Sequence, residues 1–276
     1  MRAYRIAYDG SEYHGFQRQP DVSTVEGTIL NALCDLSILG ENEDVPPGYA
    51  AAGRTDAGVS ALAQTIGFEA PDWLTPSALN SELPADVRAW AVADAPAEFH
   101  AQYDATRREY VYYLYAPDAE RAAAREALDL LSGRHDVHNL TPDDRGTERT
   151  LSTDLVIEGP FLVIRIEGSG FPRQLVRRVV GLVSEVAAGE AESGWIERVL
   201  SPEPLTGPDG IAPASPEPLL LADVRYPTLS FEPDRDAAAV ASMLFEQKRV
   251  ERMAAARVAG TIAEGIGESA SGSDSR

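Results

Sequence analysis

The chain has 276 residues, enough to bury a substantial core in one large domain or two smaller ones. It carries 44 acidic residues against 24 Lys plus Arg, a formal net charge of −20, and its only lysine is Lys248. No apolar run is long enough to span a bilayer, and the single cysteine, Cys34, excludes an internal disulfide.

These values predict a cytoplasmic protein adapted to very high salt, because an acidic surface with almost no lysine suits molar salt. The N-terminal residues lack a signal-peptide core. Such an acidic chain would normally argue against nucleic acid as a partner. At molar salt the Debye length is only about 3 Å, so local arginine clusters can still bind phosphate. The leucines around Cys34 predict that it is a small buried hydrophobe.

In chain order, residues 2–8 alternate with a period of two, which predicts a strand. Ser23 to Glu26 has the pattern of a capping box and predicts a helix that ends near Gly40. Two short strands are predicted on either side of the loop at 53–59.

The rest of the chain continues this mixture of strands and helices. Thr75 and Pro76 start a short helix, as N-cap and first helical residue. The further predicted elements are strands at 87–93, 107–115, 151–157, 161–167 and 219–225 and helices at 118–131, 171–188 and 236–259.

Each half of the chain therefore combines antiparallel strands with one or two helices, which predicts two α+β sandwiches joined edge to edge. Pro96, in the segment 94–98, suggests the boundary. We expect one domain at 1–95, a second at 96–262 and a disordered tail at 263–276, where Gly, Ser and Glu are frequent.

The loop Gly53-Arg54-Thr55-Asp56-Ala57-Gly58-Val59 places a carboxylate between two glycines at the end of a strand. Glycine permits a tight turn and lets a ligand approach the backbone. Taken alone, the motif is more typical of a turn in which Asp56 bonds to its own backbone.

Four segments resemble the TruA family of tRNA pseudouridine synthases and lie in that family's order. The first, at 8–19, has phenylalanine at position 16, where the family often has tryptophan. The segments are residues 8–19 (YDGSEYHGFQRQ), 53–59 (GRTDAGV), 99–112 (FHAQYDATRREYVY) and 171–181 (FPRQLVRRVVG).

The resemblance implies a pseudouridine synthase fold, in which two ferredoxin-like or RRM-like α/β sandwiches with antiparallel sheets flank a central cleft. It also implies that a homodimer isomerises uridine in the anticodon stem-loop of tRNA, at positions 38 to 40, without a metal or a small-molecule cofactor. The partners expected are therefore tRNA and a second copy of the chain, with no membrane.

The chemistry explains the residue types that the resemblance singles out. The reaction breaks the bond between ribose and the uracil nitrogen and rejoins the base through carbon, which suits a carboxylate nucleophile. The resemblance assigns this role to Asp56, without deciding which atom it attacks. It assigns the cation beside Asp56 to Arg177, and the general base, with a ring that stacks on uracil, to Tyr110.

Each assignment has a structural alternative. Arg177 can be a solvated helix residue, and Tyr110 a core aromatic. Arg54 is placed to fill the gap left by a flipped base or to hold a phosphate, or it forms a salt bridge within the loop. Arg173 and Arg178 can bind phosphate or lie on a solvated helix face.

Two other possibilities remain open at this level. His135 and His138 have a spacing that can bind metal on a helix, but no carboxylate or cysteine set accompanies them, which favours RNA contact or a structural role. A non-catalytic RNA-binding protein or tRNA chaperone is the alternative function. A carboxylate-dependent hydrolase would require a second acid near Asp56, and no motif supplies one.

Overall fold

The computed structural model of the chain describes residues 1–40, 43–191, 194–205 and 210–271. Within these ranges a ten-stranded sheet runs in the order β10-β4-β1-β3-β9-β5-β8-β7-β6, with β2 beside β3. The strands are β1 (Arg2–Tyr8), β2 (Ala50–Ala51), β3 (Ser60–Phe68), β4 (Val87–Asp94), β5 (Arg107–Tyr115), β6 (Gly133–Asp136), β7 (Glu148–Glu158), β8 (Phe161–Gly168), β9 (Leu219–Arg225) and β10 (Glu232–Pro233). The helices are α1 (Val25–Asp35), α2 (Pro76–Leu79), α3 (Arg121–Leu131), α4 (Leu175–Ala187), α5 (Trp195–Val199) and α6 (Arg235–Ser271), with a 3-10 turn at His138–Leu140.

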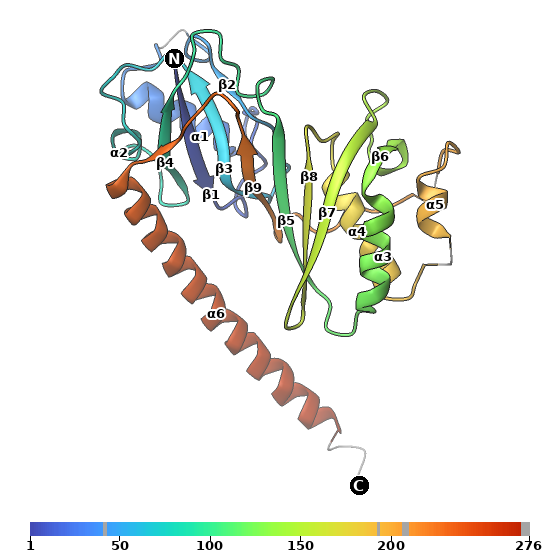
Figure 1. The fold of residues 1–276 in the computed structure, drawn as a ribbon. Coiled ribbons are helices and arrows are strands. Elements are labelled where there is room, and N and C mark those ends of the chain that lie inside the picture. The colour runs from blue at the N-terminus through green and yellow to red at the C-terminus, as the bar shows by residue number, and fades with distance from the viewer. Residues whose placement is uncertain (41–42, 192–193, 206–209, 272–276) are drawn as a thin grey trace.

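The fold is α+β. Neighbouring strands of the sheet are antiparallel, except that β9 pairs in parallel with β3. Strand β9 comes late in the chain but lies between β3 of the first half and β5 of the second. It pairs in parallel with β3 through Leu220 and Leu221, and in antiparallel register with β5. The two predicted sandwiches are thus joined edge to edge in one continuous sheet (Figure 1).

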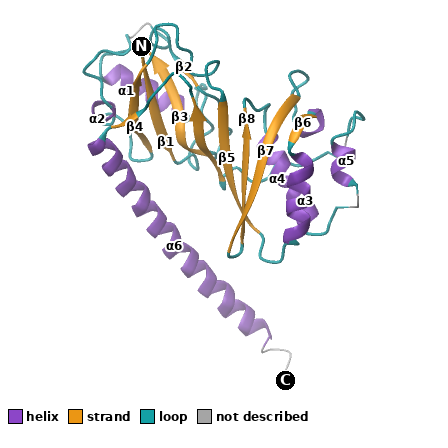
Figure 2. Cartoon of the chain, in the orientation of Figure 1, coloured by secondary structure: helices purple, strands orange, loops and turns teal. Residues whose placement is uncertain are grey.

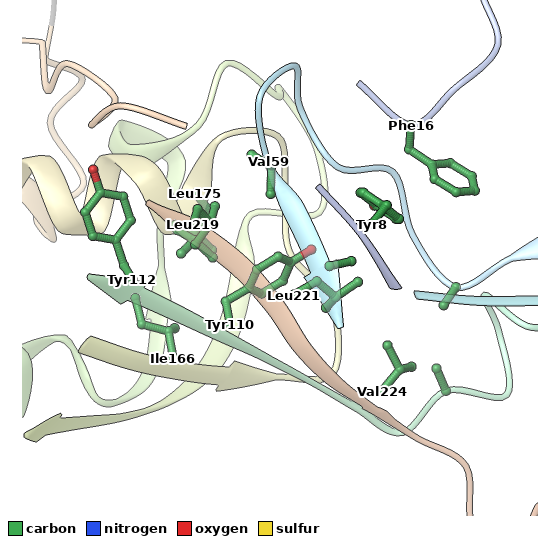
Figure 3. Close-up of a cluster of buried hydrophobic side chains, with 14 of the residues drawn as sticks. Tyr8, Phe16, Val59, Tyr110, Tyr112, Ile166, Leu175, Leu219, Leu221 and Val224 are labelled. Carbon is green, nitrogen blue, oxygen red and sulfur yellow. The ribbon is translucent and has the colours of Figure 1, made fainter. Parts of the chain in front are cut away.

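Helices accompany each half of the sheet (Figure 2). The buried face of α1 includes Ile29 and Leu33, and that of α4 includes Val179 and Val183. Helix α3 packs against α4 and β7. The core residues Tyr8, Phe16, Tyr110 and Leu221 belong to one cluster, which spans the seam between the halves (Figure 3).

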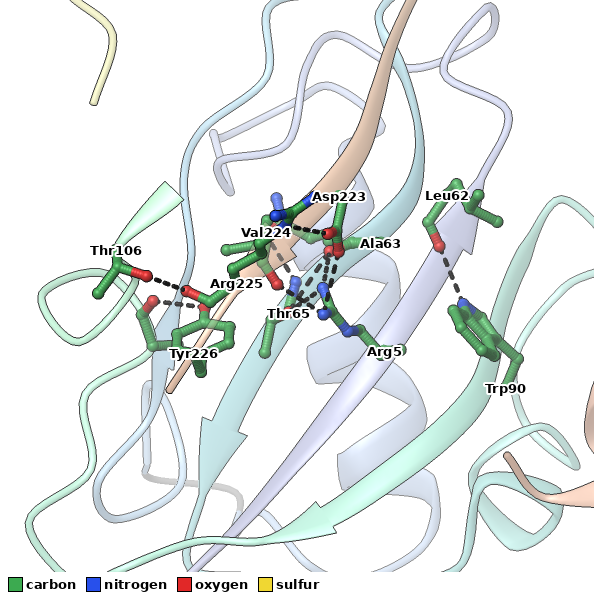
Figure 4. A network of polar contacts seen from close by, with 12 residues as sticks. Arg5, Leu62, Ala63, Thr65, Trp90, Thr106, Asp223, Val224, Arg225 and Tyr226 are labelled. Carbon is green, nitrogen blue, oxygen red and sulfur yellow. Dashed lines mark hydrogen bonds and ion pairs between the residues drawn. The ribbon is translucent and has the colours of Figure 1, made fainter. Parts of the chain in front are cut away.

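A network of polar contacts fixes β9 to the first half of the chain (Figure 4). The buried guanidinium of Arg5 on β1 donates to the Ala63 carbonyl at 3.0 Å and to the Val224 carbonyl at 2.5 Å. The same group pairs with the Asp223 carboxylate at 3.2 Å. Arg5 therefore ties three strands together with one side chain.

Several predicted boundaries were confirmed and several were wrong. The strands at 2–8, 107–115 and 219–225 begin and end where expected. Thr24, not Ser23, caps α1, and it accepts a bond from Gly27 N at 3.2 Å. The Glu26 carboxylate instead accepts a bond from Arg18 N, so the capping box is not formed.

The end of the chain also differs from the expectation. Helix α6 has 37 residues and continues to Ser271, so 263–271 are helical; residues 272–276 lie outside the described ranges. The helix starts beside β4 and projects away from the body (Figure 1). A regular helix of this length measures about 55 Å at 1.5 Å per residue. Glycines at 260, 265 and 267 lower helix propensity without preventing the helix.

Cys34 is exposed, which corrects the expectation that it is buried. Its neighbour Leu33 takes the core-facing position on α1, and successive helix residues point about 100° apart. None of the helices in the described ranges has both the length and the apolar character that crossing a membrane requires. The division of the chain at residue 95 stays a prediction.

The buried tyrosines predict a loss of stability in alkali. Burial raises the pKa of Tyr4, Tyr110 and Tyr226 from 10.0 to about 12. Between pH 10 and pH 12 the unfolded chain therefore loses protons that the folded chain keeps. The free energy of unfolding should fall by up to about 1.4 kcal/mol per pH unit for each such tyrosine.

Denaturant unfolding at molar KCl, measured from pH 9 to pH 11.5, tests this expectation. The Tyr226→Phe variant is the control, because it removes one titrating phenol and should make the fall less steep. Stability that is unchanged up to pH 11.5 would contradict the prediction.

Candidate functional site

The loop that carries Asp56 is held in place by contacts with Tyr8 and Phe16 from the first half of the chain. The Thr55 hydroxyl lies 2.7 Å from the Tyr8 hydroxyl, and both side chains are buried. The Thr55 carbonyl accepts a bond from Phe16 N at 3.0 Å. Thr55 therefore anchors the loop in the core, whereas the next residue, Asp56, keeps its carboxylate partly exposed.

The two glycines of the loop have different roles. Gly58 has φ +82°, and a Cβ added there would lie 2.9 Å from Pro216 Cγ, so both the backbone and the neighbouring residue require glycine. A Cβ on Gly53 would meet only Arg108 Nε, at 3.9 Å, which is an ordinary contact. Gly58 is thus needed for the turn, whereas Gly53 leaves open space beside the loop.

Asp56 and Arg177 meet across the seam between the halves. The Arg177 Nη1 atom lies 3.1 Å from Asp56 Oδ2, although the two residues are 121 positions apart in the chain. Nε of the same guanidinium donates to the Ala214 carbonyl at 2.7 Å, which orients it toward the carboxylate. The Arg177 side chain is 15% exposed and that of Asp56 36%, so Arg177 is not a solvated helix residue.

Tyr110 is a buried residue on β5, with its ring edge-to-face against Phe171 at 5.1 Å between centroids. Burial raises the pKa of its hydroxyl to about 12; the charge of Arg108 opposes the rise and that of Asp56 adds to it. The phenol is therefore protonated at neutral pH. In Figure 3 the ring lies among Val59, Leu219 and Leu221, which come from both sides of the seam.

A cleft of about 700 Å³ brings these groups together. Asp56, Arg177 and Tyr110 all line it, so the structure brings together the three residues that the resemblance singled out. Arg54 also lines it with an exposed side chain. Further lining residues from the first half are His14, Gln17 and Gln19, and from the second half Gln102, Arg108, Asp143, Arg149, Phe171 and Gln174.

The other predicted phosphate-binding arginines differ in position. Arg173 lines the cleft and is 69% exposed, with its Nε 2.5 Å from an Asp143 carboxylate oxygen. Arg178 is not among the lining residues, since its guanidinium donates to the Ile211 carbonyl and to Gln174 Oε1. Arg173, just before α4, and Arg177, on the first turn of α4, therefore both face the cleft, whereas Arg178 does not.

Arg108 is a cleft residue that the sequence did not single out. It lies two residues before Tyr110 on the same strand, so the two side chains share a face. This two-residue spacing is the sequence feature that could have identified Arg108 as a neighbour of Tyr110 in the cleft. The arginine is buried, and its guanidinium donates to the carbonyls of Ala52, Gln102 and Ser169.

The two histidines considered as metal ligands are on β6 and the adjoining 3-10 turn, not on a helix of regular length. His135 Nε2 lies 2.8 Å from the Ser132 carbonyl, and His138 Nδ1 lies 3.4 Å from the Asp136 carboxylate. Across the described ranges, no group of three or more His, Cys, Asp or Glu side chains is arranged to hold a metal ion.

Comparison with known proteins identifies close relatives. Residues 127–227 match the family model described as tRNA pseudouridine synthase. The chain is 54% identical over 275 residues to tRNA pseudouridine synthase A of Haloarcula marismortui, covering 96% of this chain and 100% of the relative. It is 58% identical over 264 residues to the protein of the same name from Natronomonas pharaonis, covering 95% and 98%. Both relatives come from halophilic archaea.

Similarity to solved structures is more distant. A Cbf5-Nop10-Gar1 complex matches 67% of this chain and 54% of the matched chain, with 12% identity and a TM-score of 0.32. A likeness at this level supports no argument about the site.

The different roles of the two loop glycines can be tested by a matched pair of variants. We expect Gly58→Ala to lower the free energy of unfolding by about 2 kcal/mol, because a left-handed conformation costs about 1–2 kcal/mol in a residue with a Cβ and Pro216 must also shift. Gly53→Ala should change it by less than about 1 kcal/mol. Denaturant unfolding at molar KCl gives both values, and equal losses would contradict the distinction.

Proposed function

The chain belongs to the tRNA pseudouridine synthase A family of isomerases, and from that premise we propose that Asp56 is the nucleophile that converts uridine to pseudouridine in the anticodon stem-loop of tRNA, at positions 38 to 40. The observation that carries the proposal is the pairing of Asp56 with Arg177, at 3.1 Å, in a cleft that Tyr110 also lines.

The pairing explains how a carboxylate can serve as a nucleophile in an enclosed site. A carboxylate in a cleft is stabilised and oriented by an opposite charge at contact distance. Arg177 supplies that charge, and its bond to the Ala214 carbonyl keeps it from closing over the second carboxylate oxygen. One oxygen of Asp56 is bound by Arg177, and the other is left to attack the substrate.

Tyr110 is proposed to contact the uracil ring and to act as the general base that removes the proton from the ring carbon. Its position beside Phe171 supports the contact. Its pKa of about 12 means that it must lose its proton inside the cleft before it can act as a base, and the neighbouring charge of Arg108 favours that loss. The ring contact is therefore the better supported of the two roles.

Arg54 and Arg173 are proposed to bind the RNA backbone at the rim, because both line the cleft with exposed guanidinium groups. Flipping a stacked uridine costs a few kcal/mol, and phosphate contacts on both sides offset part of that cost. The position of Arg178 gives its proposed substrate contact no support. We further propose that the protein works in the cytoplasm, which its single cysteine suits, and as a homodimer, which the resemblance to the TruA family implies.

The alternative function is RNA binding without catalysis, for example as a tRNA chaperone. Such a protein has no need of a carboxylate held by a partly buried cation beside a buried tyrosine. The experiments below separate the two functions, because a binder would be indifferent to the chemistry of Asp56.

Asp56→Asn should abolish pseudouridine formation while leaving tRNA binding within a few-fold of wild type, because the amide keeps the shape and loses the nucleophile. Unmodified tRNA transcript is incubated with protein at molar KCl without cofactor, and pseudouridine is mapped by position. Asp143→Asn is the control, since this carboxylate also lines the cleft but pairs with Arg173 at the rim. Full activity in Asp56→Asn would remove Asp56 from the mechanism.

Tyr110→Phe should slow the reaction at least about 100-fold, which is the lower range for loss of a general base, with little change in tRNA binding. Tyr112→Phe is the matched control, because Tyr112 is a buried tyrosine on the same strand that is absent from the cleft lining. Single-turnover rates provide the measurement. If Tyr110→Phe reacts as fast as wild type, its hydroxyl has no chemical role.

A further inference from the structure

Arg108 is exceptional among the buried charges of this protein. In the described ranges the charged side chains classed as buried are Arg5, Asp9 and Arg108. Arg5 pairs with Asp223, and Asp9 pairs with both Lys248 and Arg252. Arg108 has no carboxylate partner in the described part of the chain.

The surroundings of Arg108 provide dipoles but no negative charge. Its Nε and Nη2 donate to the Ala52 carbonyl at 3.1 and 2.6 Å, and Nη2 also donates to the Gln102 carbonyl at 2.7 Å. Nη1 donates to the Ser169 carbonyl. Its partners across the sheet are the uncharged residues Gly168 and Val224.

The residue that precedes Arg108 on β5 does have a carboxylate partner. Arg107, on the opposite face, forms an ion pair with Glu167. Removing a cation from water without an anion is costly. Burial accordingly lowers the pKa of Arg108, against small opposing effects of Tyr226 and Tyr110.

This unbalanced charge belongs to the lining of the cleft. Arg108 lines the cleft beside Tyr110, and its Nε lies next to the open space at Gly53. A guanidinium has five N–H donors, and the bonds above use four of them. The remaining Nη1 hydrogen has no acceptor recorded in the described chain.

The reaction creates a negative charge where such a cation is useful. When the bond from ribose C1′ to uracil N1 breaks, both electrons of the bond go to N1. The detached ring then carries a negative charge, delocalised over its two oxygens, and C1′ is left as a cation or as an ester of Asp56. The charge is neutralised when C5 bonds to C1′; the C5 proton is then removed and N1 takes up a proton. A fixed charge in a site that excludes water stabilises such an anion strongly.

We propose that Arg108 is a catalytic residue whose unpaired positive charge stabilises the uracil anion formed when the glycosidic bond breaks; this rests on the proposed function. The carbonyls of three separate segments hold its guanidinium at a fixed position beneath the bound base. The site is thereby organised for the anion before the substrate enters.

The test compares substrates whose rings accept negative charge to different degrees. Anticodon stem-loop RNA carries either uridine or 5-fluorouridine at the target position, and fluorine makes the ring anion more stable. Single-turnover consumption of the target nucleotide is measured at molar KCl. We expect Arg108→Gln to slow the uridine substrate about 100-fold or more and the fluorinated substrate by at least several-fold less.

Two variants separate charge from architecture. Arg108→Lys keeps the charge and loses the forked geometry, so it should be much faster than Arg108→Gln if charge is the cause. Arg5→Gln removes a buried arginine that also bonds to carbonyls but lies outside the cleft lining. It should slow both substrates by the same factor. An equal loss on both substrates in Arg108→Gln would overturn the proposal.

A measurement on the wild-type protein covers the case in which Arg108→Gln does not fold. Stem-loop RNA with 5-nitrouridine at the target position reports ionisation of its ring by absorbance. The negative charges of the RNA and of the protein would raise the pKa of this ring, whereas Arg108 should lower it by a unit or more on binding. A pKa that is unchanged or raised overturns the proposal.

These outcomes are distinct from failure of the proposed function. If the wild-type protein forms no pseudouridine at any tRNA position, the proposed function fails, and the ring titration still decides whether the cleft favours an anion. If pseudouridine forms and Arg108→Gln slows both substrates equally, only the role of Arg108 is wrong.

Discussion

The placement of β9 between β3 and β5 is the constraint on which the site depends. The Asp56 loop leads into β3, and Tyr110 lies on β5, so these strands must be held at a fixed distance and angle. Strand β9 fills the gap with two inward-facing leucines, Leu219 and Leu221, and backbone pairing on both edges. Arg5 ties β9 to β1 and β3 from the first half. Any loss of register along this seam would move Asp56 relative to Arg177 and Tyr110.

The distribution of charge resolves an apparent contradiction between an acidic protein and an anionic substrate. The net charge of −20 is spread over the whole chain, whereas the cleft is lined by Arg54, Arg108, Arg149, Arg173 and Arg177. At high salt, distant surface charges are screened within a few ångströms, but buried and partly buried cations are screened much less. The high identity of the chain to proteins of halophilic archaea agrees with an acidic surface adapted to high salt. The proposed RNA substrate would therefore meet the arginines of the cleft, whose charges are screened less than those of the distant acidic surface.

Some differences between prediction and structure follow from tertiary context, but the length of helix α6 does not, because residues 251–267 are exposed. Helix α6 was expected to end near residue 259 because its last third is rich in glycine and glutamate, yet the helix continues to Ser271. Strand β6 is four residues long and has no apolar alternation, so only its pairing with β7 defines it. Arg177 and Arg178 are neighbours with the same chemistry, and the segment at 211–214 accepts bonds from both guanidinium groups but turns only Arg177 toward Asp56.

By itself the sequence determined most of the local elements and pointed to the residues proposed for the chemistry. A period-two pattern marked β1, strand-forming residues marked β5 and β9, and apolar positions marked α4. The Asp56 loop identified the nucleophile candidate because its residues are contiguous. Only the tertiary structure decided the contacts between distant residues. The 3.1 Å pairing of Asp56 with Arg177, the exposure of Cys34 and the unpaired charge of Arg108 depend on which segments pack together. Local propensity acts over a few residues, whereas these properties are set by neighbours that lie tens to more than a hundred positions away.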